Sequence, residues 1–129
     1  MKSEQQAVST SSSGVASPFT ELELRHSGVD QPIAGSKGVA AAPNAFTTFF
    51  TKRYNGPAVG TAHHAAVNAN SRVFVSISEY GADPVADRFI GSARMAVYNI
   101  APFNGGFKVW TDVSWSSPLN VRIDVLVDP

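Results

Sequence analysis

The end of the chain alternates apolar and polar residues with a period of two, and this pattern constrains the fold more than any other feature. In residues 119–127, LNVRIDVLV, every odd-numbered residue is leucine, isoleucine or valine, whereas Asn120, Arg122 and Asp124 lie between them. Successive side chains of a β-strand face opposite ways, so the odd-numbered residues share one face. The segment therefore predicts a strand with one face in a hydrophobic core and the other in water.

Three segments upstream repeat this alternation, and residues typical of turns separate them. They are VFVSISEY (73–80), RFIGSARMAVYNI (88–100) and GFKVWTDVSW (106–115). Together with the final segment, they predict four consecutive strands that form a sheet meander from Val73 to Val127. Gly91 lies inside the second segment, and an interior glycine predicts a bend or bulge in that strand.

The upstream part of the chain also favours strands. Residues 19–26 (FTELELRH) alternate and predict the first strand, and residues 45–54 (AFTTFFTKRY) predict a second strand that the turn residues 55–57 end. Residues 58–70 suit either a strand or one helical turn, and a strand is favoured because their glycine and threonine weaken a helix. Residues 27–44 contain three glycines and two prolines and predict a long ordered loop with room for a short strand.

Length and composition set the domain organisation. A chain of 129 residues has room for one domain. Its residues are 43% hydrophobic and only 16% charged, which disfavours a disordered chain. We therefore expect an all-β fold: a single antiparallel β-sandwich, jelly-roll-like, with six to eight strands in residues 19–129. Residues 1–18 are rich in serine and have little to bury, so their composition predicts a mobile tail. The alternative is an extended N-terminal arm that contacts a neighbouring subunit.

The charge balance and the lack of cysteine exclude several classes of partner. The formal net charge is zero, so no basic field attracts phosphates, and we expect no nucleic-acid partner. A near-zero net charge leaves little repulsion between copies and permits a homo-oligomer. Without cysteine the chain forms no disulfide and no thiolate metal site. No segment approaches the roughly 20 apolar residues that cross a bilayer, and no signal-peptide core is visible, so we expect a soluble chain without membrane insertion.

Histidine, serine and aspartate occur in this sequence, but not in the motifs or at the spacings that are typical of catalytic and metal sites. His63 and His64 are neighbours and face opposite ways on a strand, so they lack the spacing of metal ligands. No serine stands in a G-x-S-x-G motif. Asp83 and Asp87 flank a loop that contains glycine and proline. In such loops an aspartate side chain usually stabilises a turn by accepting a hydrogen bond from a nearby backbone N–H. We therefore expect no enzymatic activity, no cofactor and no metal.

One tryptophan lies on the polar face of its predicted strand. In residues 106–115 the predicted core face contains Phe107, Val109, Val113 and Trp115, whereas Trp110 shares the other face with Lys108. A large aromatic residue on a polar face is buried by a partner subunit, offered to a ligand, or simply half-buried. Subunit contact is the favoured interpretation.

The face that Arg94 shares with Tyr98 has a similar ambiguity. The guanidinium of Arg94 suits either the hydroxyls of a ligand or an ion pair with a neighbouring strand. Tyr98 adds a second aromatic ring to the outward side. We take Trp110 and Tyr98 as candidate interface residues.

The segments VFVSI, Arg94, GFKVWTDVSW and the final alternating strand resemble the pattern of H-type lectins. The resemblance covers roughly residues 71–127. It implies a small antiparallel β-sandwich, trimers or hexamers, and galactose-type sugars bound at subunit edges with Arg94 among the contacts. Asp30 is the counterpart of an acidic loop residue in the family, and Ser116 stands where the family can have a sugar-contacting histidine.

Two functional hypotheses follow from different classes of protein. The first is a non-enzymatic, self-associating subunit of a homo-oligomer or of a higher-order assembly of the fibre, coat or shell type. The alternative is an oligomeric lectin that binds a galactose-type carbohydrate through Arg94, Asp30 and Ser116. The neutral charge and the N-terminal arm favour the first hypothesis.

Overall fold

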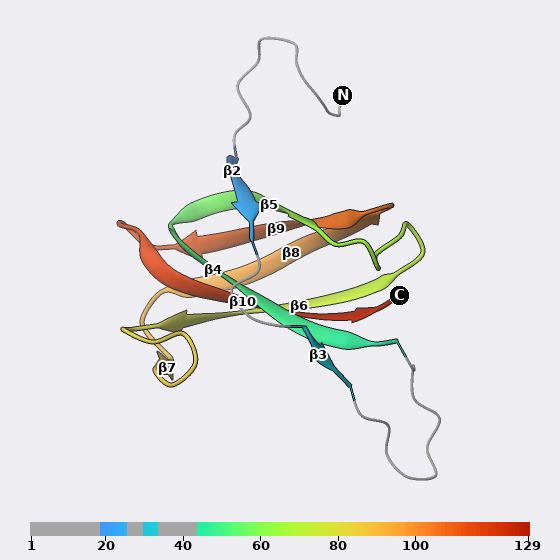
Figure 1. The fold of residues 1–129 in the computed structure, drawn as a ribbon. Helices are drawn as coiled ribbons and strands as arrows, with labels where there is room; N and C mark the ends of the chain where they lie inside the picture. The colour runs from blue at the N-terminus through green and yellow to red at the C-terminus, as the bar shows by residue number, and fades with distance from the viewer. Residues whose placement is uncertain (1–18, 26–29, 34–43) are drawn as a thin grey trace.

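The structure of the protein is a computed structural model that describes residues 19–25, 30–33 and 44–129. These residues form strands, turns and bends and no helix. The strands build a four-stranded sheet in the order β2-β5-β9-β8 and a five-stranded sheet in the order β3-β4-β10-β6-β7. Figure 1 shows the two sheets as two layers. The all-β prediction is confirmed, and two packed sheets are the architecture of a β-sandwich.

The described residues contain nine strands, two of which are only two residues long. The seven longer strands agree with the predicted six to eight. One short strand, at 31–32, lies in the loop where the sequence left room for a short strand, and the other, at 88–89, lies inside the strand predicted at 88–100. The strands are β2 (Thr20–Leu24), β3 (Gln31–Pro32), β4 (Phe46–Tyr54), β5 (Gly56–His63), β6 (Arg72–Tyr80), β7 (Arg88–Phe89), β8 (Arg94–Phe103), β9 (Gly106–Ser114) and β10 (Leu119–Asp128). The predicted arm and most of the loop predicted at 27–44 lie outside the described residues.

The core lies between β10 and β9, the central strands of the two sheets. The odd-numbered residues 121–127 of β10 are buried, as the alternation predicted. They face a second buried row on β9, where Phe107 lies 6.2 Å from Phe50 of β4 between ring centroids. Full burial of one such side chain stabilises the fold by about 1.5–3 kcal/mol.

The predicted meander is wrong because the four segments do not lie in one sheet. β6 and β10 pair with each other in the five-stranded sheet, and β8 and β9 form a hairpin in the four-stranded sheet. β10 also pairs with β4, a strand that precedes it by more than sixty residues. Alternation determines which side of a strand is apolar, but it does not determine the pairing partner.

The segment predicted as one strand at 88–100 is two strands in different sheets. β7 pairs with β6, and β8 starts at Arg94 in the other sheet. Gly91 lies in the link between β7 and β8. The bend predicted at Gly91 is therefore a crossing from one sheet to the other.

The prediction of a wholly antiparallel sandwich is also wrong at one place. β2 pairs with β5 in parallel, with Thr20 opposite Ala58 and Leu24 opposite Ala62. Between them the chain visits the other sheet through β3 and β4, and such a crossover allows parallel pairing. The faces of β2 were predicted correctly, because Leu24 is buried against the core.

Two strand ends also differ from the sequence pattern. A single residue, Asn55, separates β4 from β5, and Gly56 has a φ of 79°, a value that favours glycine. The strand predicted at 58–70 is β5, which ends at His63, and turns follow it. Trp115, predicted in the core, is 45% exposed because β9 ends at Ser114.

Candidate functional site

The outer face of the four-stranded sheet carries a row of aromatic rings. Trp110 of β9 points away from the core and is 36% exposed. Its ring centroid lies 5.2 Å from that of Phe19, just before β2, and 4.8 Å from that of Tyr98 on β8. The sequence alone had placed Trp110 and Tyr98 outward, and the fold brings the two rings into contact. We call Phe19, Trp110 and Tyr98 the aromatic row.

A β-bulge places Tyr98 in this row. Val97 pairs with Thr111 and Asn99 pairs with Trp110, so Tyr98 is an extra residue in β8. A bulge breaks the strict alternation, and both Tyr98 and Asn99 are exposed. Asn99 was missed by the sequence pattern because no turn residue marks the bulge.

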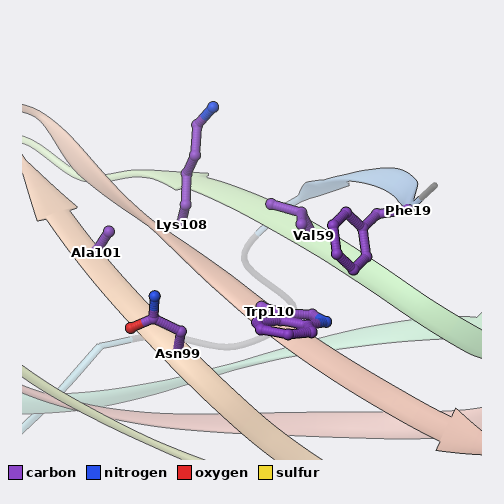
Figure 2. A pocket seen from close by; sticks show the side chains of 6 residues that line it. All are labelled: Phe19, Val59, Asn99, Ala101, Lys108 and Trp110. Carbon is purple, nitrogen blue, oxygen red and sulfur yellow. The ribbon is translucent and has the colours of Figure 1, made fainter. Parts of the chain in front are cut away.

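A shallow hollow lies beside Trp110. Its volume is about 270 Å³, and its lining comes from the strands or strand ends of all four members of the sheet. Figure 2 shows the six lining side chains: Phe19, Val59, Asn99, Ala101, Lys108 and Trp110. The hollow is mostly apolar, with one amide and one ammonium group at its sides. An exposed concave surface of this kind suits an apolar side chain or a ring.

The polar groups of the hollow have defined roles. Asn99 accepts a hydrogen bond from the backbone N–H of Ile100 through Oδ1, at 2.9 Å, so its side-chain NH₂ group is the donor that it offers. Lys108 forms no ion pair with any acidic side chain in the described parts of the chain. The side chains that line the hollow therefore offer hydrogen-bond donors and one positive charge, and no carboxylate, imidazole or hydroxyl is among them.

Two of the three predicted sugar-binding residues lie at one end of the sandwich. Arg94 pairs with Ser114 at the end of β9, and Ser116 follows two residues later. The indole of Trp115 is exposed at the same end. Asn55 donates a hydrogen bond to the carbonyl of Trp115 at 3.0 Å and fixes this link in place.

Asp30 lies at the opposite end. Its carboxylate is 2.6 Å from Nε2 of His64, and the backbone N–H of His64 donates to the carbonyl of Gly105 at the other end of β9. The length of β9 separates Asp30 from Arg94, about 27 Å for a strand of this length. One chain therefore does not unite the three predicted residues, and a site with all three would need two subunits.

The two neighbouring histidines diverge. Nε2 of His63 lies 3.4 Å from Oε1 of Glu23 on the outer face. His64 stacks on Phe46 at 4.5 Å between centroids, and its Nδ1 accepts the N–H of Ala66 at 3.1 Å. With Nδ1 accepting, the proton sits on Nε2 and is donated to Asp30. His64 thus ties β3 to the loop after β5, and both of its ring nitrogens take part.

The acidic residues considered for chemistry form turns. Asp83 accepts the N–H of Val85 and Asp87 accepts that of Ala82, each at 2.8 Å. Within the described ranges, no three histidine, aspartate or glutamate side chains come together in a way that could hold a metal ion. Over the same ranges, no helix is long and apolar enough to cross a membrane.

The sequence also missed an apolar loop on the other sheet. Ile90, just after β7, is fully exposed, and Val85 and Phe89 of the same loop are exposed as well. Phe89 and Ile90 belong to the strand predicted at 88–100, in which one of these two neighbouring side chains would be covered. These side chains are exposed because the chain leaves the five-stranded sheet after β7 and crosses to the other sheet, and the alternation of residues does not show where this happens.

Comparisons of the chain with models of known protein families, with curated proteins and with solved structures find no match. The resemblance to H-type lectins stays a prediction from the motifs of residues 71–127.

Proposed function

We propose that the chain is a non-enzymatic, self-associating subunit of a homo-oligomer or of a higher-order assembly of the fibre, coat or shell type. The observation that supports this most is the aromatic row on the outer face of the four-stranded sheet. Trp110 and Tyr98 leave 36% and 56% of their surfaces in water, on a face where a β-sandwich normally carries polar residues. Contiguous exposed apolar surface of this kind marks an interaction site.

The chemistry of the row suits a contact between proteins. Tryptophan and tyrosine are enriched among the residues that dominate interface energies, because they combine a wide apolar surface with one polar group. The rings already contact each other, so little side-chain entropy remains to be lost on association. The zero net charge of the chain adds no long-range repulsion between copies.

Two finer features belong to the same proposal. The sandwich is jelly-roll-like, and the arm of residues 1–18 reaches a neighbouring subunit. The first described residue after this segment is Phe19, a member of the aromatic row.

The mass in solution tests the proposal. Sedimentation equilibrium of the full chain should give an oligomer, and Trp110→Ser should weaken association by about 2 kcal/mol or more, which is about 30-fold. Phe74→Ser is the matched control, because Phe74 is an exposed aromatic residue on the outer face of the other sheet. A monomeric wild type at all concentrations, or equal weakening by the two variants, would reject the proposal.

A second candidate function is a lectin that binds a galactose-type carbohydrate. The observation in its favour is that Arg94 and Ser116 lie at the same end as the exposed indole of Trp115. Arg94 forms no ion pair within the described residues, so its guanidinium is available to hydroxyls, and an indole suits the apolar face of a sugar. A glycan array on wild type and Arg94→Ala decides, and the lectin candidate fails if no sugar binds or if the folded variant binds equally well.

A further inference from the structure

The hollow beside Trp110 has two chemically different sides. Figure 2 shows the rings of Phe19 and Trp110 together on one side, and the side chains of Lys108 and Asn99 on the other. The rings form an apolar wall, whereas the ammonium group and the side-chain NH₂ group offer a positive charge and hydrogen-bond donors. A ligand that fills the hollow therefore needs an acceptor at one end and a group that suits aromatic rings at the other.

Two charges of opposite sign flank the indole along β9. Lys108, Trp110 and Asp112 are alternate residues of this strand, so they share its outer face. The two charged residues each lie about 7 Å from Trp110 between Cα atoms, on opposite sides of it. Glu21 pairs with Val59, which in turn pairs with Trp110. A second carboxylate thus lies in the same cross-strand row as the indole.

The other charges of this face have a partner or lie at its ends. Oε1 of Glu23 is 3.4 Å from Nε2 of His63. Arg94 pairs with Ser114, the last residue of β9, and Arg25 follows β2 at the opposite end of the face. Around the indole itself, two carboxylates therefore stand against one ammonium group, and the carboxylates lie away from the side of the hollow that holds the lysine.

The three charges nearest the indole are not neutralised by neighbours. Within the described parts of the chain, no ion pair involves Glu21, Asp112 or Lys108. Unpaired carboxylates beside aromatic rings attract a cation, because the faces of the rings are negative as well. The unpaired ammonium group attracts an anion. The surface therefore suits a molecule that carries both charges.

The rings are arranged to hold a compact cation. The planes of Phe19 and Trp110 are inclined at 67°, and Tyr98 lies against the indole at 4.8 Å between centroids without lining the hollow. Inclined rings contact a trimethylammonium group from more than one side, which is how aromatic side chains bind quaternary ammonium ions. A hollow of about 270 Å³ is smaller than the usual site for a drug-sized ligand, so it suits a small molecule.

We propose that the hollow binds a small zwitterion with a quaternary ammonium group at one end and a carboxylate at the other. The ammonium group lies against Phe19 and Trp110, on the side of Asp112. The carboxylate accepts hydrogen bonds from Asn99 and Lys108. This inference does not rest on self-association, although the ligand and a neighbouring subunit would compete for the same indole.

Three small molecules test the proposal through the fluorescence of Trp110 in a dilute Trp115→Phe chain. Glycine betaine carries both charges, tert-butylacetate has carbon in place of its ammonium nitrogen, and tetramethylammonium lacks the carboxylate. Glycine betaine should change the fluorescence in a saturable way. Each of the other two should bind at least about threefold more weakly, because each loses one of the two charged contacts.

Charge variants of the same chain identify the two ends of the ligand. Lys108→Met should weaken glycine betaine at least about threefold and should not weaken tetramethylammonium. Asp112→Asn should weaken both ammonium ligands and should not weaken tert-butylacetate. Glu23→Gln is the matched control, because this carboxylate has His63 as its partner, and it should change none of the three affinities. Equal unfolding temperatures verify that the variants are folded.

The outcomes separate this inference from the proposed function. The inference is overturned if glycine betaine shows no saturable binding at the lowest protein concentration, or if tert-butylacetate binds as tightly. Equal weakening of all three ligands by Lys108→Met also overturns it, since the lysine would then act only through the structure. None of these results changes the mass of wild type in solution. A monomeric wild type that binds glycine betaine rejects self-association and supports the zwitterion site.

Discussion

At the scale of single residues, one buried hydrogen bond joins the two sheets. The hydroxyls of Tyr54 on β4 and Thr111 on β9 lie 2.7 Å apart, and both residues are buried. A buried hydroxyl without its partner costs the free energy of its desolvation. This pair therefore links the two sheets through a polar contact inside a mainly apolar core.

Removal of one partner should therefore be costly. Tyr54→Phe should lower the free energy of unfolding by about 1–3 kcal/mol, because it leaves the hydroxyl of Thr111 buried without Tyr54. Urea unfolding measures this. The double variant Tyr54→Phe/Thr111→Val should lose less than the sum of the two single variants. Strict additivity would show that the bond contributes nothing.

The same tyrosine should make stability depend on alkaline pH. Burial raises the pKa of Tyr54 above its ordinary value of 10.0, although the bond to Thr111 opposes this. The unfolded chain releases the phenol proton near pH 10 and the folded chain retains it to higher pH. The stabilisation is therefore complete below pH 10 and is lost as pH rises above it.

Unfolding followed at several pH values checks this. Between pH 9 and about pH 11 the free energy of unfolding should fall less steeply for Tyr54→Phe than for wild type. Tyr98→Phe is the control, since it removes an exposed phenol. If all three proteins lose stability in parallel, Tyr54 is not responsible.

The residue-scale predictions succeeded where the period of two continued and failed where it stopped. Trp110 was correctly placed outward, because it lies inside an unbroken strand. Trp115 was wrongly placed in the core, because its strand ends one residue earlier. Asn99 was missed, because the bulge at Tyr98 shifts the period and leaves no mark in the sequence.

At the scale of elements, Arg122 connects β10 with the loop between β6 and β8. Its side chain is 13% exposed, lies 4.0 Å above the ring of Phe49 and bonds both carboxylate oxygens of Asp124 as well as the carbonyl of Pro84. A largely buried charged side chain stabilises the fold only when it has an ion-pair partner and its hydrogen-bond donors are paired. The sequence showed Arg122 only as one polar residue of an alternating strand.

Replacement of this arginine should loosen the loop. Arg122→Met keeps an apolar stem over Phe49 but removes the bonds, so it should lower the free energy of unfolding by about 1.5–3 kcal/mol. Amide hydrogen exchange at Gly81 and Val85 should also become faster. Arg72→Met on the same sheet is the control, because its ion pair with Asp128 is exposed, lies away from the loop and should change stability by less than about 0.5 kcal/mol. Unchanged exchange in Arg122→Met would contradict this role.

The elements themselves were largely predictable, and their pairing was not. The longer strands were predicted within a few residues, because alternation is a local property of the chain. The exceptions are 58–70, which ran past the end of β5 at His63, and 88–100, which merged two strands. β10 pairs with β4 and β6 rather than with β9, which precedes it in sequence. Pairing between strands that are far apart in sequence depends on how the apolar faces of all the strands pack together. It therefore cannot be predicted from any one segment.

At the scale of the whole molecule, exposed apolar side chains lie at several separate places. Among them are the aromatic row on the outer face of the four-stranded sheet, the cross-strand pair of Phe74 and Leu126 on the other sheet, and Ile90 in the loop between β6 and β8. The candidate interface residues Trp110 and Tyr98 could be found from sequence, because they violate the polar pattern of their face. The exposure of Ile90 and the hollow beside Trp110 could not, since the first depends on where the chain crosses between the sheets and the second on which strands lie side by side.

The measurement that tests the central claim most directly is the exposure of Trp110 to a quencher as the protein concentration rises. The chain has two tryptophans, so Trp115→Phe makes Trp110 the only indole. Self-association through the aromatic row predicts that acrylamide quenches Trp110 readily in dilute solution and progressively less in concentrated solution. Equal quenching at every concentration would contradict the claim that this face is the subunit contact.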